Sequence, residues 1–462
     1  MEIIRLVEAK VLSMAEKILE VIEEGNDYLS FEAELKKELD NLGSEILKTV
    51  LEELDEKIHK SKERKREWEV VRRKEQKGIL TPFGLVNYER SYYRHKQTKQ
   101  YRHLVDQKVS ISPHARVGRT LKAELSEASS TQSYESSTLQ VSRYNQELKV
   151  SKQTVLQCVR EFKAKGLPEA EKKRHVPMLY IEADEDHLRI KKKRKGQARL
   201  IYVHEGVIEK PRRQLKNARH FTTVNKTTEE FWMEVCDYIE EQYELESLEA
   251  IYLSGDGGAW IKAGQEYIPG VTFILDKFHL YKYILAATAH APELKRAIYS
   301  GIRKTDKEEV IKQLQEARER ALEKPRQKRI LATINYIQNN WDGIESQIKN
   351  PHVGCSAEGH VSHILASRMS SRPMAWSKQG AENMASMRAV RANGESIKKH
   401  YLSLWSESSP IIELKTEVQK ELRKLRKRHN VGKETTNNVP LFHGVDNLTR
   451  TAIKGLNAQF VI

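Results

Sequence analysis

The sequence predicts a multidomain α/β protein in which helical regions accompany a β-sheet domain. Three observations predict this class. The chain has 462 residues, enough for two to four domains at roughly 100 to 200 residues each. Residues 31–58 carry apolar side chains at steps of three and four, which is the spacing of an amphipathic helix. Residues 171–282 instead alternate apolar and polar side chains in short runs, as strands do.

The N-terminal region, residues 1–78, is expected to be helical. Its apolar positions from Phe31 onward are Leu35, Leu39, Leu42, Ile46, Leu47, Val50, Leu51, Leu54 and Ile58. Because they fall between charged residues, the helix should pack along one face. The cation-rich stretch KSKERKREWEVVRRKEQK, from Lys60 to Lys77, follows. We expect a basic helix there, either solvated or in contact with phosphates.

Composition changes at Gly78, and residues 79–170 are predicted to hold a small β-hairpin and a helix-turn-helix-like pair. The hairpin segment GILTPFGLVNYERSYYRH combines Pro and Gly with alternating aromatic and polar residues. YESSTLQVSRYN predicts one helix, and Ser151 can cap a second, SKQTVLQCVREFKAK. Such a pair is common as a purely structural unit. In a DNA-binding pair, the second helix would bring side chains to base edges in the major groove: Lys152, Gln153 and Gln157.

Residues 171–282 predict the first part of a catalytic sheet. VPMLYIEADEDHL, GQARLIYVHEGV and RRQLKNARHFTTV indicate three strands, TTEEFWMEVCDYIEEQY a helix, and EAIYLSGDGGAW and VTFILDKFH two further strands. Three strands, a helix, a strand, a short helical turn and a strand is the order of an RNase H-like domain. The first and fourth strands are neighbours in that architecture, so Asp184 and Asp256 would lie side by side.

Paired acids at strand ends suit phosphoryl transfer. Two hard cations about 3.5 to 4 Å apart can activate a nucleophile and stabilise a leaving oxygen, and Mg²⁺ prefers oxygen ligands. A single acid at a strand end is more often a helix cap or an ion-pair partner. Asp256 is less ordinary, because it sits among small residues in SGDGG. On the first strand, periodicity alone does not choose among three acids that share one face: Glu182, Asp184 and Asp186.

Four segments resemble a known family. YIEADEDH, YLSGDGGAWI, FILDKFHLYKY and GCSAEGHVSHILASRMSSRPMAWSKQGAENMASMR resemble the Lre-two group of bacterial insertion-sequence transposases, long catalogued as an uncharacterised protein family. The similarity spans nearly the whole chain. Related DDE transposases end the strand after the second catalytic Asp with Cys or Asp, two residues and His, which Asp276-Lys277-Phe278-His279 matches. The resemblance also implies an all-helical insertion, which residues 283–350 fit because they are rich in Leu, Ala, Lys, Arg and Glu.

The resemblance implies a DDE triad of Asp184, Asp256 and Glu358. Asp184 is chosen because the family places its first acid where the apolar stretch ends. Glu358 lies at an expected helix start, in the second part of the catalytic core at residues 351–400, and Glu382 in GAENMASMR is its competitor. Supporting roles are expected for Asp276, His279 and Asp186. The triad would hold Mg²⁺, with two ions expected and Mn²⁺ as a possible substitute.

The implied enzyme binds double-stranded DNA, both the ends of its element and the target, and cleaves and joins strands as a homo-oligomer in a synaptic complex. Two alternatives stay open: an RNase H-like nuclease without strand transfer, and a catalytically silent DNA-binding protein derived from a transposase. A zinc site at His352, Cys355, His360 and His363 is a further alternative to a polar helix start near DNA, although that spacing matches no familiar closed site.

Composition agrees with a nucleic-acid partner. The chain has 80 Lys and Arg against 65 acids, a net charge of +15 and a pI near 9.3, and cations placed on phosphates release condensed counterions. The C-terminal region, residues 401–462, is expected to form a basic helix. The three cysteines, Cys158, Cys236 and Cys355, form no CxxC pair, which fits a cytoplasmic protein. No signal peptide and no apolar run of roughly 20 residues is evident, so we expect neither export nor membrane insertion.

Overall fold

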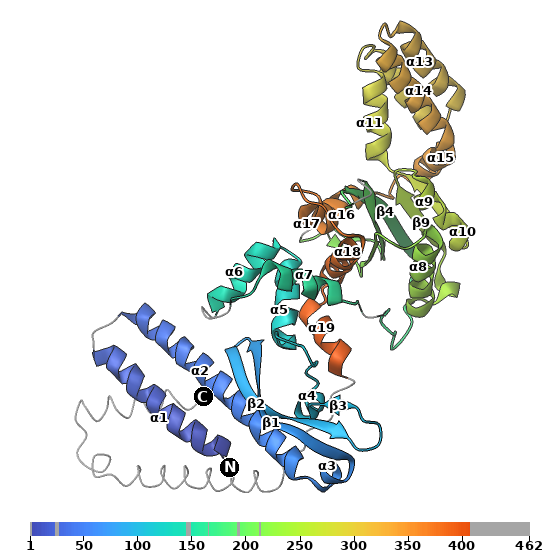
Figure 1. Ribbon diagram of the computed structural model, residues 1–462. Helices are drawn as coiled ribbons and strands as arrows, with labels where there is room; N and C mark the ends of the chain where they lie inside the picture. Colours follow the sequence, from blue (N-terminus) through green and yellow to red (C-terminus); the bar gives the residue numbers. More distant parts are fainter. Residues whose placement is uncertain are drawn as a thin grey trace, which may run out of the picture.

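The computed structural model describes residues 2–23, 27–144, 149–164, 166–191, 195–211 and 214–406. Figure 1 shows an elongated molecule with the N-terminal helices and a long hairpin at one end, a β-sheet in the middle and a group of helices at the other end. The mixed α/β class predicted from the sequence is confirmed. The basic run at residues 413–430 lies outside the described residues.

The N-terminal end combines helices with a three-stranded antiparallel sheet. Its elements are α1 (Glu2–Glu23), α2 (Tyr28–Lys60), α3 (Lys62–Glu67), β1 (Trp68–Thr81), β2 (Gly84–His95), β3 (Tyr101–Arg102) and α4 (Leu104–Lys108). Part of the apolar stripe predicted for α2 packs as expected, because Leu51 lies against Ile79, Val86 and Tyr88 of the hairpin, whereas Leu39 and Val50 are exposed. This unit therefore joins the helical region to the hairpin through one core.

The expectation of a basic helix from Lys60 to Lys77 is wrong beyond Glu67. Only α3 is helical, and the chain is a strand from Trp68 onward. Trp68, Val70 and Val71 are side chains that favour strands, and β2 offers them a partner, since Trp68 pairs with His95. The boundary expected at Gly78 also falls inside β1, where Gly78 pairs with Asn87.

Three short helices link the hairpin to the central sheet: α5 (Arg119–Ser129), α6 (Tyr134–Tyr144) and α7 (Lys152–Glu161). The two helices predicted for the helix-turn-helix-like pair are present as α6 and α7. Ser151 caps α7 as expected, because its side chain accepts a hydrogen bond from the Thr154 N–H. Val155 and Cys158 are fully buried against Leu121 and Leu125 of α5. The inner face of α7 is thus structural and leaves its other face to solvent.

The central sheet has five strands in the order β10-β9-β4-β5-β8. Strands β4, β5 and β8 are antiparallel, whereas β9 and β10 run parallel to β4. The elements of this region are β4 (Met178–Leu188), β5 (Gly196–His204), β6 (Val207–Ile208), β7 (Gln214–Leu215), β8 (Arg219–Thr223), α8 (Thr228–Gln242), η1 (Leu245–Ser247), β9 (Ala250–Gly255), α9 (Ala259–Lys262), α10 (Gly264–Tyr267) and β10 (Val271–Leu275). The five strands and the helix predicted for residues 171–282 are confirmed.

The two faces of the sheet are covered by different helices. Leu179, Ile181 and Ala183 of β4 face a core that includes Phe231 and Val235 of α8. The opposite face packs against C-terminal elements: α16 (Ala357–Val361), the π-helical turn η2 (Ser362–Ala366), α17 (Ser367–Met369), α18 (Lys378–Ala392) and α19 (Ile397–Ser406). Because side chains alternate along a strand, the even-numbered residues of β4 point toward this second set of helices.

Five helices separate β10 from α16 and form the far end of the molecule (Figure 1). They are α11 (Lys277–Ala287), α12 (Leu294–Arg303), α13 (Lys307–Arg320), α14 (Lys324–Asn339) and α15 (Trp341–Lys349). Residues 283–350, expected to be helical, contain no strand in this fully described stretch. The Gln347 amide on α15 donates 2.8 Å to the Leu275 carbonyl of β10. No described helix has the length and apolar character of a membrane span.

Candidate active site

Asp184 and Asp256 meet on neighbouring parallel strands. The last residue pair between β4 and β9 is Glu182 with Ser254, so Asp184 and Asp256 each lie two residues beyond it. Burial raises the pKa of Asp184 to about 6, and the charge of Asp256 contributes to that rise. The juxtaposition expected from the strand order is therefore present. Each carboxylate also accepts one nearby backbone N–H at 2.8 Å, from Glu185 and from Gly258.

The glycines beside Asp256 allow close approach of the backbone. A Cβ on Gly255 would lie 2.8 Å from the Ala183 carbonyl oxygen of β4, so the two strands need glycine at this position. Gly257 has φ +88°, and a Cβ there would lie 2.4 Å from the Asn340 side-chain oxygen. The glycines of SGDGG are therefore required by packing, because they let the loop of the second acid lie against β4 and against the residue that follows α14.

Helix α14 fixes the loop that carries Asp256. The Tyr336 hydroxyl donates 2.8 Å to the Asp256 carbonyl oxygen. Burial, with Asp256 as the next cause, raises the pKa of Tyr336 well above its usual value, so the hydroxyl remains a donor. Sequence analysis missed this contact, since eighty residues separate the partners and no local pattern marks a tyrosine that reaches back to a distant loop.

Asp276 and His279 lie next to the pair of aspartates. Asp276 follows β10, its N–H donates 2.9 Å to the Gly255 carbonyl, and its side chain caps α11 by accepting from the Phe278 N–H. His279 Nδ1 lies 2.8 Å from Asp276 Oδ2. This bond raises the pKa of His279, and the charges of Asp256 and Asp184 add to the effect. The DKFH motif therefore places a histidine with a raised pKa beside two carboxylates.

Glu182, a neighbour of Asp184 on the same face of β4, holds the start of α16. Its side chain is buried and accepts hydrogen bonds from the Tyr202 hydroxyl at 2.5 Å and the Ser356 hydroxyl at 3.2 Å, and it contacts His204 Nε2 at 3.1 Å. The Ser356 N–H donates to it as well. Burial tends to raise the pKa of Glu182, but the bonds from His204 and Tyr202 hold it below its usual value.

Glu358 lies in the first turn of α16, two residues after Ser356, and its side chain is exposed. Ala357 and Val361 pack α16 onto the sheet face that carries Tyr202, which is also the face of Asp184. The helix that carries Glu358 therefore lies on the sheet face of Asp184. Within the described residues the three predicted acids do not form a closed ligand set, because no group of three His, Cys, Asp or Glu side chains is arranged to hold a metal.

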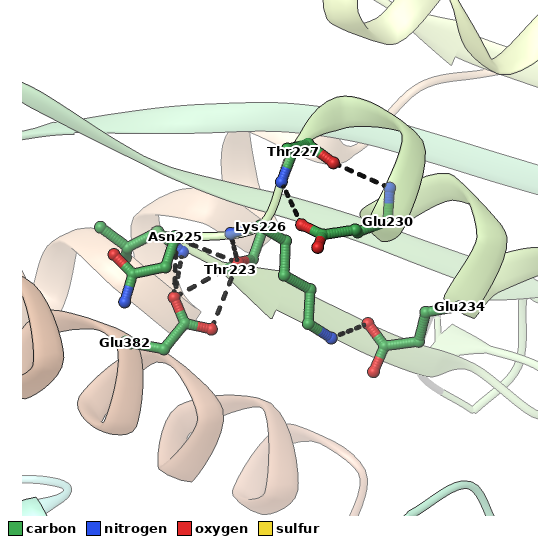
Figure 2. A network of polar contacts seen from close by, with 8 residues as sticks. Thr223, Asn225, Lys226, Thr227, Glu230, Glu234 and Glu382 are labelled. Atoms are coloured by element: carbon green, nitrogen blue, oxygen red, sulfur yellow. Dashed lines mark hydrogen bonds and ion pairs between the residues drawn. The ribbon is translucent and has the colours of Figure 1, made fainter.

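Glu382, the competitor for the third acid, is engaged by backbone instead. Its carboxylate accepts hydrogen bonds from the Val224 N–H at 2.7 Å, the Asn225 N–H at 2.8 Å and the Thr223 hydroxyl at 3.2 Å, and Figure 2 shows it facing Thr223 and Asn225. These bonds fix the turn between β8 and α8, and a capping box of Thr227 and Glu230 starts that helix. A carboxylate with its oxygens used this way has a structural role.

The other predicted residues have different surroundings from the two aspartates. Burial raises the pKa of Asp186, and a hydrogen bond with Ser370 opposes that rise. Lys152, Gln153 and Gln157 are all exposed on α7, in agreement with their expected availability. Lys152 pairs with Glu135 at 3.0 Å. The histidine and cysteine cluster proposed as a zinc alternative forms no such site in the described chain: His360 instead packs edge-on against the Tyr202 ring, with centroids 4.3 Å apart.

A carboxylate pair of this kind suits a hard divalent cation. Asp184 and Asp256 offer oxygen donors, which Mg²⁺ prefers, and burial raises the pKa of Asp184, so its charged form would gain from further compensation. A bound cation would supply that compensation. The donor chemistry of Asp184 and Asp256 therefore fits the metal that the family resemblance implies.

Comparison with known proteins gives a family and close relatives. The model of an uncharacterised protein family (UPF0236) matches residues 21–404. One UPF0236 protein of Caldanaerobacter subterraneus subsp. tengcongensis is 39% identical over 383 residues, which cover 82% of this chain and 81% of the relative. A second from the same strain is 38% identical, covering 84% of each chain. A UPF0236 protein of Streptococcus gallolyticus is 25% identical, covering 85% of this chain and 89% of its own length.

Proposed function

We propose that this chain, which belongs to the uncharacterised protein family UPF0236, is a metal-dependent DNA transposase of the DDE type. The observation that carries the proposal is the meeting of Asp184 and Asp256 on adjacent parallel strands, where burial and mutual repulsion raise the pKa of Asp184 to about 6. A carboxylate with a perturbed pKa beside a second acid is typical of catalytic sites.

The sheet topology supports an RNase H-like assignment. Three antiparallel strands, a helix and two strands parallel to the first occur in that order, with β9 beside β4. We propose that α11–α15 are the helical insertion of the family and that α16 returns the chain to the catalytic face with Glu358. The engagement of Glu382 by backbone N–H groups favours Glu358 as the third acid.

Each residue then has a distinct task. Asp184 and Asp256 would hold the cations, and Glu358 would complete the ligand set. Bound Mg²⁺ would lower the pKa of an attacking water or DNA 3′-hydroxyl and stabilise the leaving oxygen. His279, made more basic by Asp276, supplies a positive charge to a phosphate beside the aspartates. Tyr336 keeps the Asp256 loop in place.

The names of the relatives give independent support. The name of one joins eleven locus designations of a single bacterial strain, and that of another joins four. Many copies of one protein in one genome are expected of a mobile element that encodes its own transposase. We propose DNA as the partner, in agreement with the net charge of +15.

A homo-oligomer is the second part of the proposed assembly. The α1 helix exposes large apolar side chains, among them Leu12 at 66%, Leu19 at 57% and Ile22 at 57%. Burial of such side chains against a second copy would remove apolar surface from water. The N-terminal helices are therefore the proposed interface within a complex that holds two DNA ends.

The test is cleavage of DNA that contains the coding sequence with its flanking regions. In the presence of Mg²⁺ we expect nicks at both borders, and Asp256→Asn should reduce their rate at least about a thousandfold, because a lost carboxylate ligand costs several kcal/mol of transition-state stabilisation. Asp237→Asn is the matched control, since Asp237 is exposed on α8. Undiminished border cleavage by Asp256→Asn would refute the assignment.

Two other functions have different outcomes in the same assay. An RNase H-like nuclease would cut but would not join pre-cut ends to a second DNA molecule. A catalytically silent DNA-binding protein would retain the border DNA without cutting it. Strand-transfer products from pre-cut ends therefore separate the proposed transposase from both.

A further inference from the structure

The hairpin end of the molecule carries a row of aromatic rings that the catalytic proposal does not use. The Tyr92 and Tyr101 rings are stacked, with centroids 5.6 Å apart and planes 23° apart. The His103 ring lies on Tyr92 at 4.7 Å, and the Arg72 guanidinium lies 5.2 Å from the Tyr92 centroid. We call these residues, together with Arg102, the hairpin surface. Tyr101 is 51% exposed, so the row ends at a side chain that is open to solvent.

A large pocket adjoins this row. Its volume is about 780 Å³, and its lining includes all five residues of the hairpin surface together with His114 and Arg119. A pocket of this size accommodates a nucleotide-sized ligand. Aromatic and basic side chains at one concave site are the combination with which proteins bind unpaired nucleotides, because rings stack on bases and cations meet phosphates.

The acids in the pocket are already neutralised. Asp106 is buried and forms an ion pair with Arg90, and it accepts 2.7 Å from the Tyr88 hydroxyl. Glu75 lies 3.1 Å from His103 Nε2, 3.5 Å from an Arg90 nitrogen and 3.6 Å from an Arg72 nitrogen, so Arg72 already has one carboxylate partner. These contacts leave little negative charge to repel an anionic ligand.

The loop beside Tyr101 adds positive charge. Residues 94–102, RHKQTKQYR, contain four Lys or Arg and no acid. Lys96 and Lys99 are exposed at the turn, and Arg102 is exposed and donates to the Gln100 side chain at 3.0 Å. A phosphate backbone that passes over Tyr101 would therefore meet the positive charges of this loop.

We propose that the hairpin surface binds an unpaired segment of DNA, with a base stacked on Tyr101 and the adjoining phosphates on Arg72 and Arg102. The inference rests on the proposed function in that DNA is the partner, and it adds where single-stranded DNA is held. The surface lies on the N-terminal unit, apart from the sheet that carries the aspartates (Figure 1). It would retain the unpaired strand of a DNA end while the paired part reaches the acids.

The experiment measures binding by the full chain in a chelator, without catalysis. The probes are a fluorescent twenty-nucleotide poly-thymidine strand, a duplex with a six-nucleotide overhang, and the same duplex with blunt ends. We expect Tyr101→Ala to weaken binding to the strand and the overhang by about 5- to 100-fold and binding to the blunt duplex by less than about twofold. Tyr101→Phe keeps the ring and should restore the affinity. Tyr28→Ala removes another exposed tyrosine, 73% exposed on α2, and should change nothing.

Arg102→Gln provides a second variant that leaves the aromatic row in place. It should reduce the salt dependence of strand binding, since one phosphate contact is lost. Equal losses for blunt and overhang DNA, or no loss in either variant, would overturn the proposal. If the variants lost binding to poly-glutamate and kept binding to poly-thymidine, the proposal would be overturned in favour of an acidic peptide as the ligand. A chain that binds overhangs through Tyr101 but cuts no borders leaves this inference standing and refutes the transposase proposal alone.

Discussion

Asp184 is predicted to destabilise the metal-free protein at neutral pH. Its carboxyl has a pKa of about 6 in the folded chain, because of burial and the nearby charge of Asp256, against 3.8 for an unperturbed group. A folded-state pKa above the unfolded value means that the folded state binds more protons between these two pH values. The contribution of Asp184 to the free energy of unfolding is therefore most favourable below about pH 4 and is lost as the pH rises through 6.

The size of the effect follows from the displacement of the pKa. A shift from 3.8 to about 6 corresponds to at most about 3 kcal/mol, and we expect about 1 to 3 kcal/mol because Asp184 is partly exposed to screening solvent. Asp184→Asn has nearly the same shape and carries no charge. At pH 8 in a chelator, this variant should melt at least about 2 °C above the wild type. The difference should shrink as the pH approaches 4.

The assay is a thermal melt of both proteins from pH 4.5 to 8.5, with and without Mg²⁺. Saturating Mg²⁺ should stabilise the wild type, by about 2.7 kcal/mol at a hundred times its dissociation constant, and should leave Asp184→Asn unchanged. Glu358→Gln, at an exposed side chain, is the control and should change metal-free stability by less than about 0.5 kcal/mol. An Asp184→Asn variant that is no more stable than the wild type at pH 8 would contradict the reasoning.

Two further predictions concern the sheet and the loop beside the acids. Burial, with the charge of His360 as the next cause, lowers the pKa of His220 from 6.5 to about 4. The contribution of His220 to the free energy of unfolding is therefore fully present above pH 6.5. Up to about 3 kcal/mol of it is lost as the pH falls toward 4. Melting of His220→Gln should depend less on pH across that window, and equal slopes would exclude this cause. Gly257→Ala should destabilise the chain by more than about 2 kcal/mol, because alanine at φ +88° is strained and its Cβ meets Asn340 at 2.4 Å. Gly270→Ala is the matched control, with φ +74° and nothing within 4 Å, and chemical denaturation should show the smaller loss there.

The sequence predicted the sheet well because its signals are local. Each strand alternates apolar and polar side chains. The helix α8 begins at a capping box of Thr227 and Glu230, which is a local sequence pattern. The strand order placed Asp184 beside Asp256 correctly. The helix start at Ser356 was also predicted, because a serine before an apolar-periodic run is a local signal.

The errors and omissions involve partners that are distant in the chain. The cation-rich first half of β1 was expected to continue the basic helix. Its pairing with β2 makes it a strand instead, and that pairing depends on tertiary structure. The bond from Tyr336 to the Asp256 loop and the contact of Asn340 with Gly257 also depend on how α14 returns to the sheet. No local sequence pattern predicts that α14 packs against the loop of Asp256.

The three acids of β4 show why periodicity could not assign their roles. They share one face by alternation, but each meets a different partner: Glu182 binds Ser356 at the start of α16, Asp184 faces Asp256, and Asp186 contacts Ser370. Glu182 is a positioning residue, because its buried contacts set where α16 begins and so where Glu358 projects. A surface ion pair could not serve this purpose, since solvent would weaken it, whereas a buried, hydrogen-bonded carboxylate fixes its partner in one place. Asp184 and the glutamate that holds the start of the Glu358 helix are thus two residues apart on β4, and the geometry of the proposed site depends on a glutamate that is not one of its three acids.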